Sequence, residues 1–230
     1  MSLRELAKNK LGGNVGRVLS VIYNRLPLNN RFSIRGKDNQ LQLAGNYLKH
    51  SSIVIRGNGN QIIFKGGGNN FLNHCTLKIY GNNNRIVLSG ERNSLLGVEI
   101  WIEDDGNRFE AGSRNVILHG THLALTEGCE IRFGDDNLFS SYCVFRTGDS
   151  HSILSAVTGE RINPARSIRV ADRVWGGART TLLKGASVAA DSIIATGSVV
   201  TKTFEESNVL IGGTPARVLK QQVKWLKERI

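Results

Sequence analysis

The 230-residue chain has few cysteines, few prolines and no long apolar run. Cys75, Cys129 and Cys143 are scattered and contain no CxxC pair, which argues against a disulfide framework or a zinc site and fits a reducing compartment. No apolar stretch reaches the roughly 18 residues of a membrane span, and the N-terminus lacks an apolar core of the secretory type. These absences predict a cytoplasmic protein without a bound metal.

Positive charge, in contrast, is abundant and unevenly placed. The net charge is +11, and residues 1–37 hold eight Lys or Arg against one Glu, which accounts for +7 of it. Such an excess favours an anionic partner, for example an acidic glycan or a membrane surface touched peripherally through residues 1–37. The same segment could instead simply cap the end of the fold. Nucleic acid is not expected, because aromatic residues make up only 7% and no nucleic-acid motif accompanies the charge.

Glycine is plentiful, with 26 residues, and the second half of the chain repeats every six residues. From residue 170 it reads VADRVW, GGARTT, LLKGAS, VAADSI and IATGSV. A helix of period 3.6 would scatter the columns of this repeat around its circumference, whereas six-residue units of strand and corner stack them. Three such units form one triangular coil of about 18 residues. Successive coils then pair as parallel strands about 4.8 Å apart. The first column is mostly large and aliphatic: Val170, Gly176, Leu182, Val188, Ile194 and Val200.

A looser repeat with recurring asparagines fills the first half. Asparagines stacked at a corner can hydrogen-bond between coils, and we therefore expect one continuous solenoid over 31–213. Residues 1–30 are expected to be a basic, helical N-terminal arm or cap. Residues 214–230 are expected to form a C-terminal helix, with Pro215 at its start and an apolar face. The two asparagine series are Asn39, Asn60, Asn84 and Asn107, and Asn70, Asn93 and Asn115; the apolar face comprises Leu219, Val223, Leu226 and Ile230.

The segment 146–217 resembles the hexapeptide-repeat acyltransferases, and among them most closely the O-acetyltransferases of sugars and capsular polysaccharides. The stretches that carry the resemblance are RTGDSHSI (146–153), TGERINPARSIRVADRVWGGA (158–178), GSVVTK (197–202) and GGTPARVLK (212–220). It implies an all-β fold, a left-handed parallel β-helix or triangular solenoid, here with short terminal helices. Three positions depart from the family pattern: Ser152, Ala171 and Gly176. Gly176 would leave a gap in the aliphatic ladder.

The resemblance also implies roles for residues near position 150. His151 lies 24 residues before Trp175, as in the family, and would be the general base that takes a proton from a sugar hydroxyl. By its neighbours alone it would more often be a surface histidine that caps a turn. Asp149 would orient the imidazole or contact the acceptor, unless it only caps the turn. Trp175 would border the thioester and the acceptor groove, the alternative being a residue of the ladder.

Acetyl-CoA is the acyl donor that the resemblance implies, and no metal is expected. Small residues would let its pantetheine arm approach the backbone of the C-terminal coils. Basic residues would meet its phosphates, although each could also be a solvated surface residue. The positions are Gly177, Ala178, Thr196 and Thr201 for the arm, and Lys202, Arg217 and Lys220 for the phosphates.

The sequence therefore predicts an acetyl-CoA-dependent O-acetyltransferase that acts on a sugar hydroxyl, of a capsular or other surface polysaccharide or its precursor. The family resemblance adds a homotrimer with the cleft between neighbouring prisms, and the net charge favours an acidic carbohydrate acceptor. Two alternatives stand beside this prediction. The same fold could act on an amino sugar or another small acceptor, or the chain could be a non-catalytic β-helix that only binds.

Overall fold

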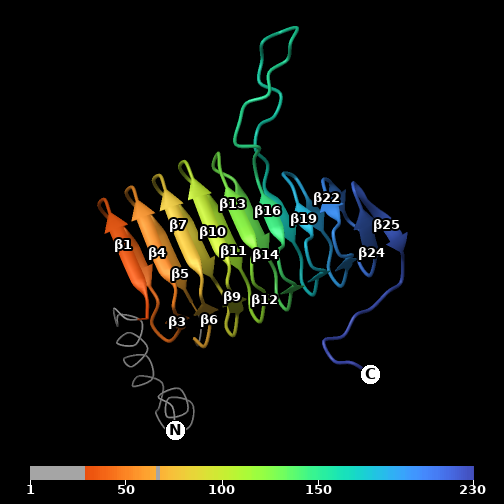
Figure 1. Ribbon diagram of the computed structural model, residues 1–230, viewed down its shortest axis with the longest axis horizontal. Helices are drawn as coiled ribbons and strands as arrows, with labels where there is room; N and C mark the ends of the chain where they lie inside the picture. The colour runs from red at the N-terminus through yellow and green to blue at the C-terminus, as the bar shows by residue number, and fades with distance from the viewer. Residues whose placement is uncertain (1–28, 66–67) are drawn as a thin grey trace.

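The computed structural model describes residues 29–65 and 68–230, and every regular element in them is a β-strand. Except for the last pair, β24 and β25, neighbouring strands within a sheet lie three elements apart along the chain and are parallel. Each coil thus adds one strand to each of three sheets in turn, which gives a β-solenoid with three faces. The coils stack along the long axis of the molecule (Figure 1). The prediction of an all-β parallel β-helix is confirmed.

The three sheets are named A, B and C. Sheet A comprises β1 (Arg31–Arg35), β4 (Ser52–Arg56), β7 (Thr76–Tyr80), β10 (Glu99–Glu103), β13 (His122–Leu125), β16 (Val144–Arg146), β19 (Thr181–Leu182) and β22 (Val199–Val200). Sheet B comprises β2 (Gln40–Gln42), β5 (Gln61–Phe64), β8 (Arg85–Leu88), β11 (Arg108–Ala111), β14 (Glu130–Phe133), β17 (Ile168–Val170), β20 (Ser187–Val188) and β23 (Thr203–Phe204). Sheet C comprises β3 (Tyr47–Lys49), β6 (Phe71–Asn73), β9 (Ser94–Leu96), β12 (Val116–Ile117), β15 (Leu138–Phe139), β18 (Trp175–Gly176), β21 (Ile193–Ile194), β24 (Leu210–Gly213) and β25 (Ala216–Lys220).

Turns between successive sheets form three edges of the prism, which we call AB, BC and CA after the sheets they join. Inside the prism, apolar side chains stack in register from coil to coil. Leu77, Ile100 and Leu123 illustrate this in sheet A, where each is fully buried above the next. Because side chains alternate between the two faces of a strand, the residues that alternate with these core residues along each strand point to solvent. Each sheet therefore has an outward face whose chemistry is independent of the core.

Buried asparagines line two of the edges, as the sequence repeat predicted. Along the BC edge the Asn93 side-chain amide donates to Asn70 Oδ1 at 2.9 Å, and that of Asn115 donates to Asn93 Oδ1 at 3.0 Å. Along the AB edge the Asn60 amide donates to Asn39 Oδ1 at 3.1 Å. An amide is suited to this position because it donates to one coil while it accepts from another. The prediction that the asparagines hydrogen-bond between coils is confirmed.

A cluster of phenylalanine rings fills the gap expected at Gly176. Phe139 is the partner of Gly176 in the preceding coil, and its ring stacks on Phe133 at 5.3 Å and meets Phe145 edge-on at 5.0 Å. A Cβ at position 176 would lie 2.3 Å from Phe139 Cδ1. The glycine is therefore required by the bulk of its neighbour, and the ladder has no gap.

We expect Gly176→Ala to lower the free energy of unfolding by about 1–3 kcal/mol, because the new methyl group overpacks the core against Phe139. The measurement is urea denaturation of the variant beside the wild type. Phe139→Leu in the same chain is the control, since a smaller side chain makes room for the methyl group. The double variant should lose less stability than the sum of the two single variants. Simple additivity would show that the two residues do not compete for this space.

Residues 214–230 contain a strand, β25, where a helix was expected. After β24 the chain turns back and β25 pairs with it antiparallel, Gly213 opposite Ala216 and Gly212 opposite Arg217. The residues after β25 form no regular element. The prediction of a C-terminal helix was wrong because the last coil leaves a row of unpaired backbone groups, which a returning strand satisfies and a helix cannot. The expected N-terminal helix falls mostly within residues 1–28, outside the described residues.

Candidate functional site

A long loop interrupts the AB edge and carries His151. It extends from residue 147 to 167, between β16 and β17, and projects from the prism as a narrow arm (Figure 1). Part of the arm is hairpin-like, since Leu154 and Arg161 form an antiparallel bridge and Ile162 N donates to Ile153 O at 2.9 Å. His151 lies exposed at the base of this arm.

The buried Asn163 fixes the backbone around His151. Its side-chain nitrogen donates to His151 O and to Asp149 Oδ2, both at 2.8 Å, and its Oδ1 accepts from Ile153 N at 2.7 Å. One side chain thus holds the chain before, at and after the histidine. Asn163 was not among the predicted site residues. The Asn-Pro pair in the loop was the signal that could have identified it.

Asp149 belongs to the same clamp. Its carboxylate accepts hydrogen bonds from the Lys184 ammonium of the next coil and from Asn163. The Lys184 hydrogen bond, followed by that of Asn163, lowers the pKa of the Asp149 carboxyl below its usual value. These contacts tie the Asp149 carboxylate to the base of the loop.

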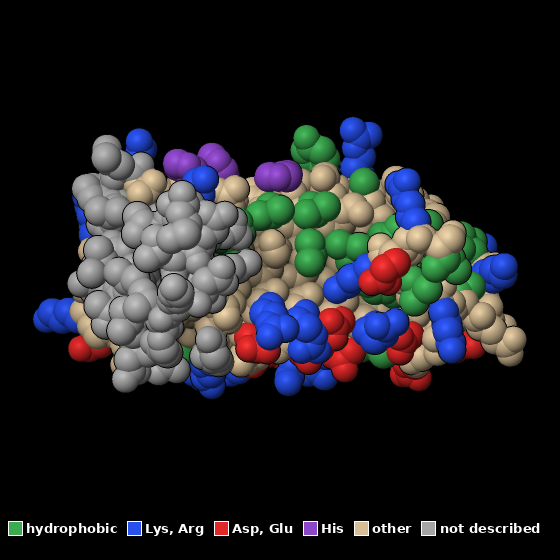
Figure 2. Space-filling model, turned by 90° about the horizontal axis from the view of Figure 1, so that it is seen from below, with side chains coloured by type: hydrophobic (Ala, Val, Ile, Leu, Met, Phe, Trp, Pro, Cys, Tyr) green, Lys and Arg blue, Asp and Glu red, His purple; other side chains and the backbone are tan. Residues whose placement is uncertain are grey.

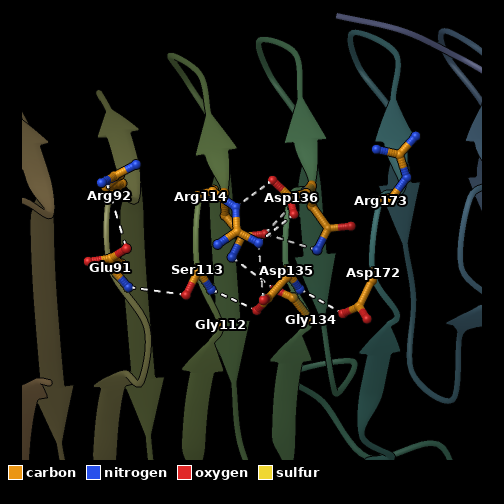
Figure 3. A network of polar contacts seen from close by, with 12 residues as sticks. Glu91, Arg92, Gly112, Ser113, Arg114, Gly134, Asp135, Asp136, Asp172 and Arg173 are labelled. Carbon is orange, nitrogen blue, oxygen red and sulfur yellow. Dashed lines mark hydrogen bonds and ion pairs between the residues drawn. The ribbon is translucent and has the colours of Figure 1, made fainter. Parts of the chain in front are cut away.

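A ladder of polar side chains runs along the BC edge as far as Asp172 and Arg173 (Figure 3). Ser113 N donates to Asp135 Oδ1 at 2.8 Å, and Asp135 N donates to Asp172 Oδ1 at 2.7 Å, so each carboxylate caps the turn of the coil before it. Beside them Arg114 donates to both oxygens of Asp136, and this contact lowers the pKa of the Asp136 carboxyl. The turns that precede β15 and β18 are thereby tied together.

Trp175 points outward from sheet C and packs against a second tryptophan. It lies in register between Leu138 and Ile193, is 38% exposed, and its ring lies 6.1 Å from that of Trp225. Trp225 is 6% exposed, and its indole N–H donates to Arg173 O at 2.8 Å. The C-terminal segment thus returns to the BC edge and supports one side of Trp175. The sequence does not reveal this contact, because nothing near residue 225 in the chain identifies its partner.

Trp225→Ala should release the C-terminal segment without unfolding the solenoid, because Trp225 is its largest buried anchor. Amide hydrogen exchange, read by mass spectrometry over 208–230, should be at least about tenfold faster, the ratio given by a loss of about 1.4 kcal/mol. Leu226→Ala is the matched control, since Leu226 is exposed. Equal exchange in wild type and Trp225→Ala would mean that the tryptophan does not hold the segment.

The structure brings some of the predicted cofactor residues together and separates others. Gly177, Ala178 and Thr196 meet at the CA edge, where a Cβ on Gly177 would lie 2.7 Å from Thr196 N and Gly197 N donates to Ala178 O. Thr201 and Lys202 are exposed on the AB edge, between β22 and β23. Arg217 and Lys220 are exposed on β25.

His151 and Trp175 are on opposite sides of the prism. His151 leaves the AB edge, and in a triangular coil that edge faces away from sheet C, which carries Trp175. A single prism therefore does not bring the histidine to the tryptophan or to the small residues of the CA edge. Any site that uses all of them needs two prisms.

Within residues 29–65 and 68–230, no group of three or more His, Cys, Asp or Glu side chains has the arrangement of a metal site. No helix in this part of the chain has the length and apolar character needed to cross a membrane.

The hexad repeat, the triangular coil and the arm define a parallel β-solenoid of the hexapeptide type. No protein-family model matches the chain. A polysialic acid O-acetyltransferase of Escherichia coli O1:K1 / APEC is 28% identical over 122 residues, which cover 53% of this chain and 39% of that protein. A polysialic acid O-acetyltransferase of Neisseria meningitidis is 24% identical over 103 residues, or 45% of this chain and 48% of that protein.

A solved structure extends the likeness to most of the fold. The crystal structure of the polySia-specific acetyltransferase NeuO aligns with a TM-score of 0.79 over 88% of this chain and 84% of that chain, at 25% identity. The matches in sequence span less than half the length of the two curated relatives. The resemblance inferred from the motifs is thus confirmed in sequence and in fold.

Proposed function

We propose that the protein is an acetyl-CoA-dependent O-acetyltransferase that modifies a sugar hydroxyl of a capsular or other surface polysaccharide, or of its precursor. The observation that carries the proposal is His151, held at the base of the arm by Asn163 in a solenoid similar to a polySia-specific acetyltransferase. Residues 31–213 are its catalytic domain. The reaction belongs in the cytoplasm, where acetyl-CoA is available and free cysteines stay reduced.

His151 is the general base of the proposed reaction. Its imidazole removes the proton of the sugar hydroxyl while the oxygen forms a bond to the thioester carbonyl carbon. The carbon–sulfur bond then breaks, and the imidazolium returns the proton to the departing thiolate, so that ester and free CoA result. The clamp made by Asn163, Asp149 and Lys184 keeps the histidine in place for both transfers. Preorganisation of this kind removes the need to order the loop during the reaction.

The CA edge is the proposed seat of the pantetheine arm. Gly177 has no side chain there, Ala178 and Thr196 have small ones, and Thr201 extends the path on the AB edge. The Gly177 N–H is already bonded to Ile194 O, whereas among the described residues the Ala178 N–H donates to no backbone carbonyl. Ala178 N is therefore our candidate to stabilise the oxyanion of the tetrahedral intermediate. Lys202, Arg217 and Lys220 are exposed cations suited to the phosphates of CoA.

A homotrimer is part of the proposal, because one prism separates His151 from Trp175. The outward face of sheet C offers an apolar surface for a second copy (Figure 2). Apolar side chains lie in register along it and are half-buried: Val116, Leu138, Ile193 and Leu210, with Leu96 and Leu118 beside them. Contact of one copy's AB edge with this face of the next copy would join the histidine to the tryptophan. Repeated head to tail with a rotation of a third of a turn, such a contact closes a ring.

The test combines turnover with the product formed. Thiol release from acetyl-CoA is measured with a panel of acidic capsular oligosaccharides, neutral oligosaccharides and amino sugars, and products are identified by mass spectrometry. Thiol release that depends on an oligosaccharide, with an added acetyl ester, supports the proposal. If an N-acetylated amino sugar is the only product, the acceptor is an amino sugar and not a polysaccharide. If acetyl-CoA does not bind, the proposal that the protein is an acetyltransferase is rejected. Sedimentation of the same sample measures whether the active species is a trimer.

A further inference from the structure

The outward face of sheet A carries a different chemistry from the other two faces. Its middle rows combine aromatic and cationic side chains. Register places Arg35, Arg56 and Tyr80 in one row, and Lys78 beside Trp101 in the next. Tyr80 and Trp101 are half-buried and Arg56 is exposed, so their outer surfaces face solvent.

The two aromatic rings form one platform with cations at its margin. The ring centroids of Tyr80 and Trp101 lie 5.5 Å apart. Lys78 Nζ lies 4.4 Å from the centre of the Trp101 ring, and the Arg56 guanidinium carbon 5.8 Å from the centre of the Tyr80 ring. Flat aromatic surfaces of this kind pack against the C–H faces of sugar rings, and the neighbouring cations attract anionic groups. An acidic sugar has both features.

The acidic residues on this face compensate only part of its positive charge. Glu99 is paired with Lys78 at 2.9 Å, and Glu103 accepts the Trp101 indole N–H at 2.8 Å. Arg35, Arg56 and Arg146 form no ion pair with any acid of the described residues. Guanidinium groups bind carboxylates through two parallel hydrogen bonds. The charge on the face therefore matches a chain whose sugars carry carboxylates.

The same face leads directly to His151. Arg146, at the end of β16, donates to Ser150 Oγ at 2.7 Å and so joins sheet A to the base of the arm. From Arg56 to Arg146 the face crosses four coil spacings, which at about 4.8 Å each span about 19 Å. A polymer lying along the strands' stacking direction would bring one of its sugars to the histidine.

We propose that the outward face of sheet A, from Arg35 and Arg56 over Tyr80 and Trp101 to Arg146, is a docking track for a polysaccharide of carboxylated sugars. The inference rests on the proposed function, for which it specifies the acceptor class and its path. The track binds sugars of the polymer that are distant from the reacting hydroxyl and thereby places another of its sugars beside His151. Short acceptors that cannot reach the aromatic platform would bind more weakly than long ones.

Sheet B provides the matched comparison. It also carries exposed arginines, among them Arg132 and Arg169, which are partners on adjacent strands. They line a groove of about 600 Å³ together with Ser187 and Thr203. In this groove the charge of the arginines is offset by Asp172 and Glu205, and its only aromatic side chain, Phe204, is buried. Arg132→Glu therefore changes charge as much as Arg56→Glu does, on a face without an aromatic platform.

The experiment measures binding of purified full-length protein to long polysialic acid chains, with dextran as the neutral probe. Arg56→Glu and Trp101→Ala should each raise Kd for polysialic acid at least tenfold, and Arg132→Glu should leave it within twofold. Thermal unfolding checks that Trp101→Ala is folded, and Arg56→Glu tests the track independently of that residue. The track is overturned if both track variants bind polysialic acid with the wild-type Kd. It is also overturned if Arg132→Glu raises Kd as much as they do, or if dextran binds as tightly as polysialic acid.

His151→Ala separates this inference from the proposed function. The variant should bind polysialic acid as tightly as the wild type, because His151 lies beyond the platform. If the wild type binds the polymer through sheet A but releases no thiol from acetyl-CoA, the proposed reaction fails and the track stands. If the wild type acetylates the polymer while both track variants bind it normally, the reaction stands and the track fails.

Discussion

The His151→Ala variant is expected to lose about 10²–10⁴ in kcat, the contribution of a positioned general base. Alanine removes the only group at the arm's base that we assign to proton transfer, and it leaves the clamp intact, since Asn163 bonds to the backbone oxygen of residue 151. The fold and the CoA site should therefore be preserved. Thiol release under saturating acetyl-CoA, with the acceptor that the wild type uses best, measures the effect.

His119→Ala is the control for that experiment. His119 is an exposed histidine on the CA edge, between β12 and β13, and we assign it no part in catalysis. It should keep wild-type kcat. A His151→Ala enzyme as fast as the wild type would remove His151 as the base, and the turn-capping alternative would then account for it. An equal loss in both variants would indicate a general effect of removing an imidazole from the surface.

Phe133→Ala should lower the free energy of unfolding by about 3–5 kcal/mol, the usual cost of removing a fully buried aromatic ring. Phe133 is 1% exposed and contacts three other rings, with centroids 5.7 Å away at Phe109, 5.3 Å at Phe139 and 5.0 Å at Phe145. These rings fill the coils directly below the arm. The cavity left by alanine cannot be filled by collapse, because the parallel strands around it are held in register by the coils on both sides.

Urea denaturation followed by circular dichroism measures the loss. Tyr142→Ala is the control, since this aromatic side chain is 60% exposed and its removal should change stability by less than about 0.5 kcal/mol. A loss below about 1 kcal/mol in Phe133→Ala would mean that the aromatic cluster is less tightly packed than its ring distances indicate.

The agreement between sequence and structure is best where a repeat governs the fold. The hexads and the two asparagine series predicted stacked coils and amide ladders, because each unit contacts only its neighbours and local period is enough. Gly176 shows the limit of that argument. Phe139 from the preceding coil fills the space beside Gly176. The hexad repeat alone does not show how much space the side chain of a neighbouring coil occupies.

The predictions that were wrong or incomplete concern contacts that occur once and are not part of a repeat. The apolar positions of residues 219–230 fitted a helix, but Leu219 and Leu226 are exposed and Trp225 is the residue that is buried. Residues 216–220 instead form β25 beside β24, because an open sheet edge offers backbone hydrogen bonds that local propensity does not anticipate. Asn163 and Lys184 likewise acquire their roles from Asp149 and His151, which meet them only after the loop closes.

By itself the sequence determined the solenoid, its core columns and the motif around His151, since these depend on residue type and spacing along the chain. Tertiary structure decided which face each residue occupies. It placed His151 on the edge opposite Trp175, returned Trp225 to cover that tryptophan, and gathered Tyr80 and Trp101 from different coils into one platform. The physical reason is that coiling sets residues from different turns of the chain side by side, and neighbours across coils follow from register, which the chain acquires only when it folds.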